Sequence, residues 1–115
     1  MKKDVFVFFE HILDSIEKVE QYLAGKKKDE FVSSDILQDA LVRRLEIIGE
    51  ATRNIPESAR IRYPNVPWQD ISDMRNKLIH EYFIVDLDVV WNVIETDLPV
   101  LKRQILEILR AERTT

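Results

Sequence analysis

The sequence contains no cysteine and only two histidines, His11 and His80, among its 115 residues. Without cysteine there is no disulfide framework and no thiol chemistry, and two isolated histidines leave a zinc site short of ligands. We therefore expect neither a metal centre nor a bound cofactor. No apolar run reaches transmembrane length, and "VFVFF" is interrupted by Glu10, His11 and Asp14 before it resembles a signal peptide. The expectation is a cytoplasmic protein that does not contact a membrane.

Glycine is also scarce, with two residues in the chain, whereas leucine, isoleucine, glutamate, lysine and arginine are abundant. This composition favours long helices over a turn-rich β architecture. A hydrophobic content of 45% with 33% charged residues is typical of a folded globular protein, and 115 residues suit one domain with one core. The sequence predicts a single all-α domain over residues 1–115.

Apolar residues at helical spacing predict four long helices separated by short connections. Together they predict an antiparallel up-and-down bundle of four to five helices. The segment 56–68 carries three prolines and is expected to be the main loop, with at most a short turn of helix. The first helix is expected between an N-cap at Asp4 and a stop at Gly25, and a polar connector at 26–29 follows it. The second should run from Ser33 or Ser34 to Pro56, and the third from Trp68 or Asp70 to about Phe83. The fourth should start at Asp86 as N-cap and have a kink or restart at Pro99 that Asp97 could cap.

The second predicted helix contains a glycine and a pair of like charges. Gly49 costs roughly 1 kcal/mol relative to alanine inside a helix, so close approach by another helix is its expected compensation. Glu46 and Glu50 lie one turn apart, which is unfavourable unless a cation is near. Either they form a solvated pair assisted by Arg43 or Arg53, or they orient Arg75 from the facing helix.

The charge distribution is uneven along the chain. The net charge of −4 argues against a general nucleic-acid coat. Residues 43–77 are nevertheless net positive by two, with seven basic and five acidic side chains, and six of the seven basic residues are arginine. Arginine suits two-pronged contacts to phosphate, although a solvated helix surface of mixed charge explains the same composition.

The stretch "MRNKLIHEYF", residues 74–83, places several reactive side chains in one decapeptide. On a helical wheel, Met74, Leu78 and Tyr82 form a core-facing stripe. The opposite face mixes apolar and polar groups, which predicts a two-fold dimer that buries Ile79 and Phe83. Such a dimer would bring together two copies of the polar residues on that face, which are Arg75, Asn76 and His80.

These side chains can support phosphoryl chemistry on RNA. An imidazole can transfer a proton near neutral pH, and a guanidinium can neutralise charge growing on a phosphoryl oxygen. The internal 2′-hydroxyl of RNA can act as nucleophile, so His80 and Arg75 would need only Asn76 or Tyr82 for positioning. The alternative is that the arginine, histidine and tyrosine cap and pack a helix end.

The spacing of Arg75, His80 and Tyr82 matches the R-x4-H-x-Y motif of HEPN domains. Four stretches in order resemble the HepT branch, the toxins of HepT/MntA toxin–antitoxin systems, and extend the similarity over roughly residues 5–110. A bare R-x4-H match is weak, but this ordered set is specific. The stretches are "RRLEIIGEA" (43–51), "YPNVPW" (63–68), "MRNKLIHEYF" (74–83) and "VDLDVVW" (85–91).

The resemblance implies a homodimeric helical bundle with a composite, metal-independent endoribonuclease site in the dimer cleft, acting as a type VII-like toxin. Arg75 and His80 would be catalytic, and Asn76 would take the polar position after the arginine. The partner would be an MntA-like nucleotidyltransferase antitoxin that transfers AMP to Tyr82 and blocks the site. The alternative is a non-catalytic, nucleotide-binding or partner subunit of a nucleotidyltransferase.

Overall fold

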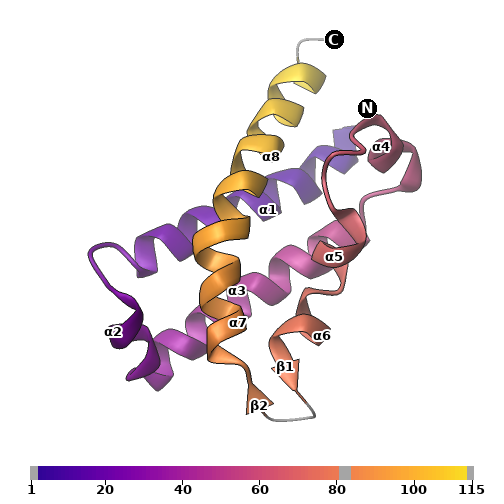
Figure 1. Ribbon diagram of the computed structural model, residues 1–115. Helices are drawn as coiled ribbons and strands as arrows, with labels where there is room; N and C mark the ends of the chain where they lie inside the picture. Colours follow the sequence, from indigo (N-terminus) through magenta and orange to yellow (C-terminus); the bar gives the residue numbers. More distant parts are fainter. Residues whose placement is uncertain (1–2, 81–83, 114–115) are drawn as a thin grey trace.

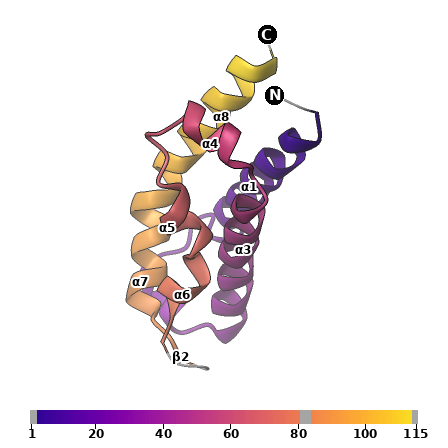
Figure 2. The same ribbon diagram turned by 90° about the vertical axis from the view of Figure 1, so that its right-hand side faces the viewer.

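The computed structural model describes residues 3–80 and 84–113, with only the backbone of Lys3 and His80. Two long helices, α1 (Lys3–Tyr22) and α3 (Asp35–Arg53), lie side by side and run in opposite directions (Figure 1). The C-terminal helices α7 (Leu87–Asn92) and α8 (Leu98–Arg113) continue one another and cross over this pair. Figure 2 shows α5 (Trp68–Ser72) and α6 (Met74–Leu78) between that column and α3. The short helices α2 (Lys28–Val32) and α4 (Glu57–Arg62) complete the fold, which confirms the all-α class.

One hydrophobic core joins the long helices, as their three- and four-residue apolar spacing predicts. On α1 the fully buried aromatic residue is Phe9, whereas its neighbour Phe8 is half-buried. Phe9 makes an edge-to-face contact with Trp68, whose ring nitrogen donates to the carbonyl of Tyr63 at 3.0 Å. This contact fixes the segment 56–68 against the core. Its helix, α4, has six residues and is therefore somewhat longer than the short turn that was predicted.

Several helix ends follow the local signals of the sequence. Ser34 caps α3 by accepting from the Leu37 N–H at 3.1 Å, and Asp86 caps α7 by accepting from the Val89 N–H at 3.1 Å. Gly25, at a φ of 74°, adopts the left-handed conformation that ends the turn after α1. The predicted cap at Asp4 is wrong, because α1 is already helical at Lys3. Half of the expected polar connector 26–29 belongs to α2.

Pro99 is accommodated without a break in the helix. Residues Val93–Asp97 form a π-helical turn, η1, and the Leu98 N–H bonds to the Val93 carbonyl five residues back. Proline lacks an N–H, and its ring crowds the carbonyl four residues earlier. A widened turn in front of it relieves both problems. The predicted cap at Asp97 is therefore wrong, since that residue lies inside the continuous helix and pairs with Lys77 at 3.6 Å.

The predicted helix from Trp68 to Phe83 is also wrong. It is broken at Asp73, and α6 ends at Leu78. Residues Ile79–His80 form a strand, β1, that pairs antiparallel with β2 (Ile84–Val85). Ile79 and Val85 lie opposite one another, and the Asp86 N–H closes the hairpin on the Leu78 carbonyl at 2.9 Å. Branched side chains favour a strand, and a five-residue helix is too short to resist that pairing.

This correction removes the wheel argument for the dimer face. Ile79 is half-buried and packs against the core of its own chain rather than facing away from it. Tyr82 and Phe83 lie outside the described residues. Within residues 3–80 and 84–113, none of the helices combines the length and the hydrophobicity that a membrane span needs.

Candidate functional site

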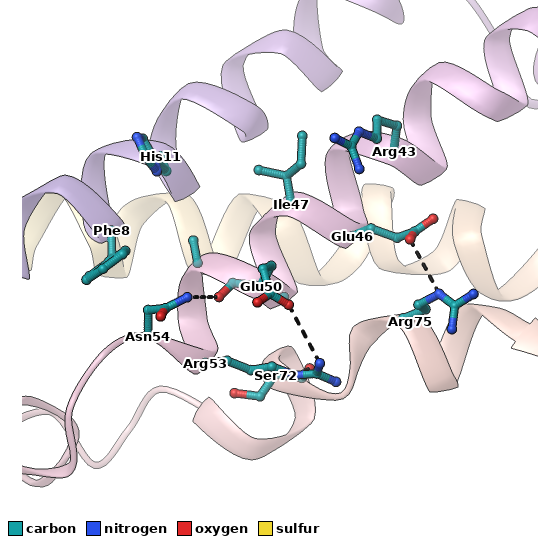
Figure 3. A pocket seen from close by; sticks show the side chains of 12 residues that line it. Phe8, His11, Arg43, Glu46, Ile47, Glu50, Arg53, Asn54, Ser72 and Arg75 are labelled. Atoms are coloured by element: carbon teal, nitrogen blue, oxygen red, sulfur yellow. Dashed lines mark hydrogen bonds and ion pairs between the residues drawn. The ribbon is translucent and has the colours of Figure 1, made fainter.

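A groove of about 320 Å³ follows the outer face of α3, with α1 on one side and the α5–α6 junction on the other (Figure 3). Its walls carry five charged residues of opposite signs and a half-buried aromatic ring. Arg75, the motif arginine, lies at one end, and His11 lies on the far wall. The lining side chains include Phe8 and His11 from α1, Arg43, Glu46, Ile47, Glu50 and Arg53 from α3, and Ser72 and Arg75 from the junction.

Arg75 is the second residue of α6 and is oriented by α3. Its Nε lies 3.5 Å from Oε2 of Glu46, and the two side chains are 64% and 30% exposed. Glu46 therefore faces Arg75 from the neighbouring helix, as in the second of the two alternatives that the sequence left open. Because the carboxylate engages Nε, the two terminal nitrogens of Arg75 remain available, with no partner among the described residues. They are the pair that can grip a phosphate in two-pronged fashion.

Glu50 has a different partner from Glu46. Its Oε2 lies 3.6 Å from Nη1 of Arg53, as in the alternative that the sequence left open. Arg53 also donates from Nε to the carbonyl oxygen of Ser72 at 3.0 Å. The two glutamates therefore hold two different arginines of the same groove.

Gly49 allows α5 and α6 to approach α3, which confirms the close contact predicted for it. A β-carbon at this position would lie 3.0 Å from the Ile71 carbonyl oxygen and 3.2 Å from Cβ of Met74. Both distances are tighter than ordinary van der Waals contact. The absence of a side chain therefore brings the α5–α6 junction, and with it Arg75, close to Glu46.

The structure describes the other motif residues only in part. Asn76 is exposed on α6, directly after Arg75. The His80 backbone lies in β1 and pairs with Ile84, so the histidine follows the arginine across a change from helix to strand. Tyr82 falls outside the described residues. The roles predicted for these three residues remain predictions.

The sequence reasoning missed several residues of the groove and its support. His11 and Phe8 were given no role in a site, although they lie one turn apart, which could have marked them as one surface. Ser72 and Arg60 carried no local signal. Across the described parts of the chain, no three His, Asp or Glu side chains form a group that could hold a metal ion.

A second polar cluster lies away from the groove, where α4 meets the end of α8. The Glu112 side chain is 2% exposed and accepts hydrogen bonds from the Tyr63 hydroxyl and from Nη1 of Arg62, the latter at 3.1 Å. The Tyr63 hydrogen bond, with help from Arg62, holds the pKa of Glu112 below its ordinary value although burial opposes this. Burial and the same contact raise the pKa of Tyr63. The cluster pins α4 to α8.

The helical fold and the groove around Arg75 agree with a family assignment. Residues 12–108 match the HepT-like ribonuclease family, and the chain belongs to it. It is 42% identical to "Putative RNase TTE0752" of Caldanaerobacter subterraneus over 92% of this chain and 95% of that protein. It is 39% identical to "Probable ribonuclease HepT" of Thermococcus cleftensis over 89% of this chain and 93% of that protein.

A longer relative has a second named activity. "Gamma-glutamylcyclotransferase and putative RNase MJ0434" of Methanocaldococcus jannaschii is 48% identical over 95% of this chain, which spans only about half, 49%, of that protein. No solved structure matches the chain significantly.

Proposed function

We propose that this chain is a metal-independent endoribonuclease whose site combines Arg75 and His80. The observation that carries the proposal is the position of the Arg75 side chain and its contact with Glu46, in a chain of the HepT-like ribonuclease family. Its guanidinium lies at a groove and is held through Nε by Glu46, and its terminal nitrogens have no partner among the described residues. This arrangement suits a group that meets a phosphate rather than one that only caps a helix.

The proposed reaction is an internal transfer at phosphorus. His80 removes the proton of a ribose 2′-hydroxyl, and the oxygen attacks the adjacent phosphorus while the bond to the 5′-oxygen breaks. The departing 5′-oxygen takes up a proton, so the products are a 2′,3′-cyclic phosphate and a 5′-hydroxyl. Arg75 balances the charge that grows on the non-bridging oxygens, and Asn76 helps to position the phosphate.

A two-fold homodimer would supply both proton-transfer groups. Each chain carries one motif histidine, whereas cleavage uses a base and then an acid. Two copies of His80 in one cleft would provide the pair. We retain Ile79 and Phe83 as the proposed interface, with the difference that Ile79 would contribute only the part of its surface that its own core leaves exposed.

We further propose that the chain is the toxin of a toxin–antitoxin pair and is neutralised by an MntA-like nucleotidyltransferase. AMP added to Tyr82 would place an anion two residues from His80, where it can pair with Arg75 and exclude RNA. Co-expression with the nucleotidyltransferase should add AMP units to the intact mass, and Tyr82→Phe should abolish them. Neutralisation without a mass change would refute modification as the mechanism.

RNA cleavage by the purified chain tests the enzyme directly. We expect cleavage that persists in EDTA, leaves 2′,3′-cyclic phosphate ends and disappears in His80→Ala. Expression of the chain alone should arrest growth, and the same variant should relieve it. Cleavage equal in His80→Ala, or lost on chelation, would overturn the proposal.

A second candidate is a non-catalytic partner subunit of a nucleotidyltransferase. It is favoured by the net charge of −4 and by the two glutamates that line the groove, which weaken attraction for RNA. A stable complex with the nucleotidyltransferase, without RNA cleavage by the free chain, would support this alternative.

A further inference from the structure

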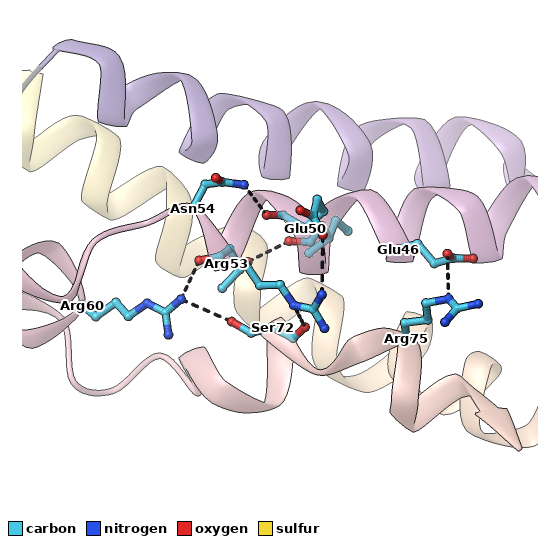
Figure 4. A network of polar contacts seen from close by, with 9 residues as sticks. Glu46, Glu50, Arg53, Asn54, Arg60, Ser72 and Arg75 are labelled. Carbon is cyan, nitrogen blue, oxygen red and sulfur yellow. Dashed lines mark hydrogen bonds and ion pairs between the residues drawn. The ribbon is translucent and has the colours of Figure 1, made fainter. Parts of the chain in front are cut away.

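Two arginines hold Ser72, the last residue of α5, at two different atoms (Figure 4). Arg53 donates from Nε to the Ser72 carbonyl oxygen at 3.0 Å, and Arg60 donates from Nη2 to the Ser72 hydroxyl at 3.4 Å. Ser72 itself is only 5% exposed. Arg60 also donates to the Thr52 carbonyl at 2.8 Å, so the ends of α3 and α5 are joined three residues before Arg75.

One face of α3 makes three contacts with the α5–α6 junction. Glu46, Gly49 and Arg53 are spaced by three and four residues, which places them on the same side of the helix. Glu46 meets Arg75, Gly49 lies against the Ile71 carbonyl, and Arg53 binds the Ser72 carbonyl. The position of the junction against α3 is therefore fixed on both sides of Gly49.

We propose that Arg53 is a positioning residue that acts through Arg75. The helix that carries Arg75 has five residues, too few to hold its own orientation, so its place depends on the junction before it. Without the bond from Arg53, the Ser72 carbonyl no longer ties this junction to α3, and Arg75 moves relative to Glu46. Glu50, 3.6 Å from Nη1 of Arg53, keeps the guanidinium over Ser72.

The catalytic consequence rests on the ribonuclease role proposed above, but the geometric link does not. A misplacement of about 1 Å at a catalytic group can lower a rate by roughly a hundredfold. Arg53→Ala should therefore lower kcat by about tenfold or more with a smaller change in KM. A direct RNA contact by Arg53 would instead raise KM. Arg53→Lys should recover part of kcat, because its ammonium can still donate to one carbonyl.

Arg44→Ala is the matched control. Arg44 lies on the same helix, and its side chain has no partner among the described residues. Both alanine variants are assayed well below their melting temperatures, so that a loss of stability alone leaves kcat unchanged. A normal kcat in Arg53→Ala, with only a lower melting temperature, would make Arg53 purely structural and refute the proposal.

A spectroscopic readout separates this inference from the ribonuclease proposal. In protein labelled with 15N-arginine, the Nε–H resonance of Arg75, identified by its loss in Arg75→Lys, reports the contact with Glu46 without RNA. We expect this resonance to shift in Arg53→Ala and to stay in place in Arg44→Ala. If the wild type lacks ribonuclease activity and the resonance still shifts, the proposed function fails and the positioning role stands. An unchanged resonance overturns the positioning role.

Discussion

The two glycines of the chain allow one substitution to be tested in two settings. Gly49→Ala gains roughly 1 kcal/mol of helix propensity. It also places a β-carbon 3.0 Å from the Ile71 carbonyl oxygen, where overpacking costs about 1–3 kcal/mol. The net loss of stability should therefore lie between zero and about 2 kcal/mol. The junction must move by a few tenths of an ångström, and we expect RNA cleavage to fall by roughly tenfold.

Gly25→Ala provides the control, since its added β-carbon meets nothing within 4 Å but the residue has a φ of 74°. Holding alanine in that conformation costs about 1–2 kcal/mol, similar to the loss expected at Gly49. Thermal unfolding and RNA cleavage are measured for both variants. Only Gly49→Ala should lose activity below its melting temperature. Equal activity losses, or full activity in Gly49→Ala, would refute the link between this close contact and Arg75.

Three further predictions address other parts of the molecule. Glu112→Gln should cost roughly 2 kcal/mol at neutral pH, because hydrogen bonds to a charged group are lost. Because the pKa of Glu112 is lower in the folded than in the unfolded state, the ionised carboxylate stabilises the fold above the unfolded-state pKa, and this contribution is lost as the pH falls through the folded-state pKa. The melting temperatures of the variant and the wild type should therefore converge in acid. Arg75→Lys should reduce cleavage nearly as much as Arg75→Ala, because lysine lacks the planar fork; full activity would make the arginine structural. Phe83→Glu should abolish dimerisation and cleavage together in sedimentation and nuclease assays, and a monomer that still cleaves RNA would contradict the shared site.

The features that the sequence predicted well depend on neighbouring residues. The caps at Ser34 and Asp86 need only a side-chain oxygen and an N–H three residues on, so local chemistry decides them. Gly49 was equally informative, because a costly glycine inside a helix needs a compensating contact. By contrast, the strand at Ile79 depends on pairing with Val85. The helical spacing of apolar residues in "MRNKLIHEYF" could not reveal that this pairing competes with continuation of the helix.

The hydrogen bond between Arg53 and Ser72 could not be predicted from the sequence for a related reason. Their hydrogen bond joins positions 19 residues apart and forms only when α5 ends against the C-terminal half of α3. The sequence did indicate Arg53 as a companion of Glu50, and that contact is present. It gave no sign that the same guanidinium also binds a backbone carbonyl before the motif, because any residue supplies such a carbonyl.

Arg75 and His80 of the R-x4-H motif consequently lie on two different structural elements, a helix and a strand. Arg75 lies on a helix whose position depends on α3, through Glu46 and the contacts around Ser72. The His80 backbone belongs to a strand whose position depends on the ladder with Ile84 and Val85. In a continuous helix both residues of R-x4-H would share one support, whereas here the arginine is contacted by α3 and the histidine backbone is paired within the hairpin. Residues outside the motif can therefore alter the geometry between the two catalytic candidates.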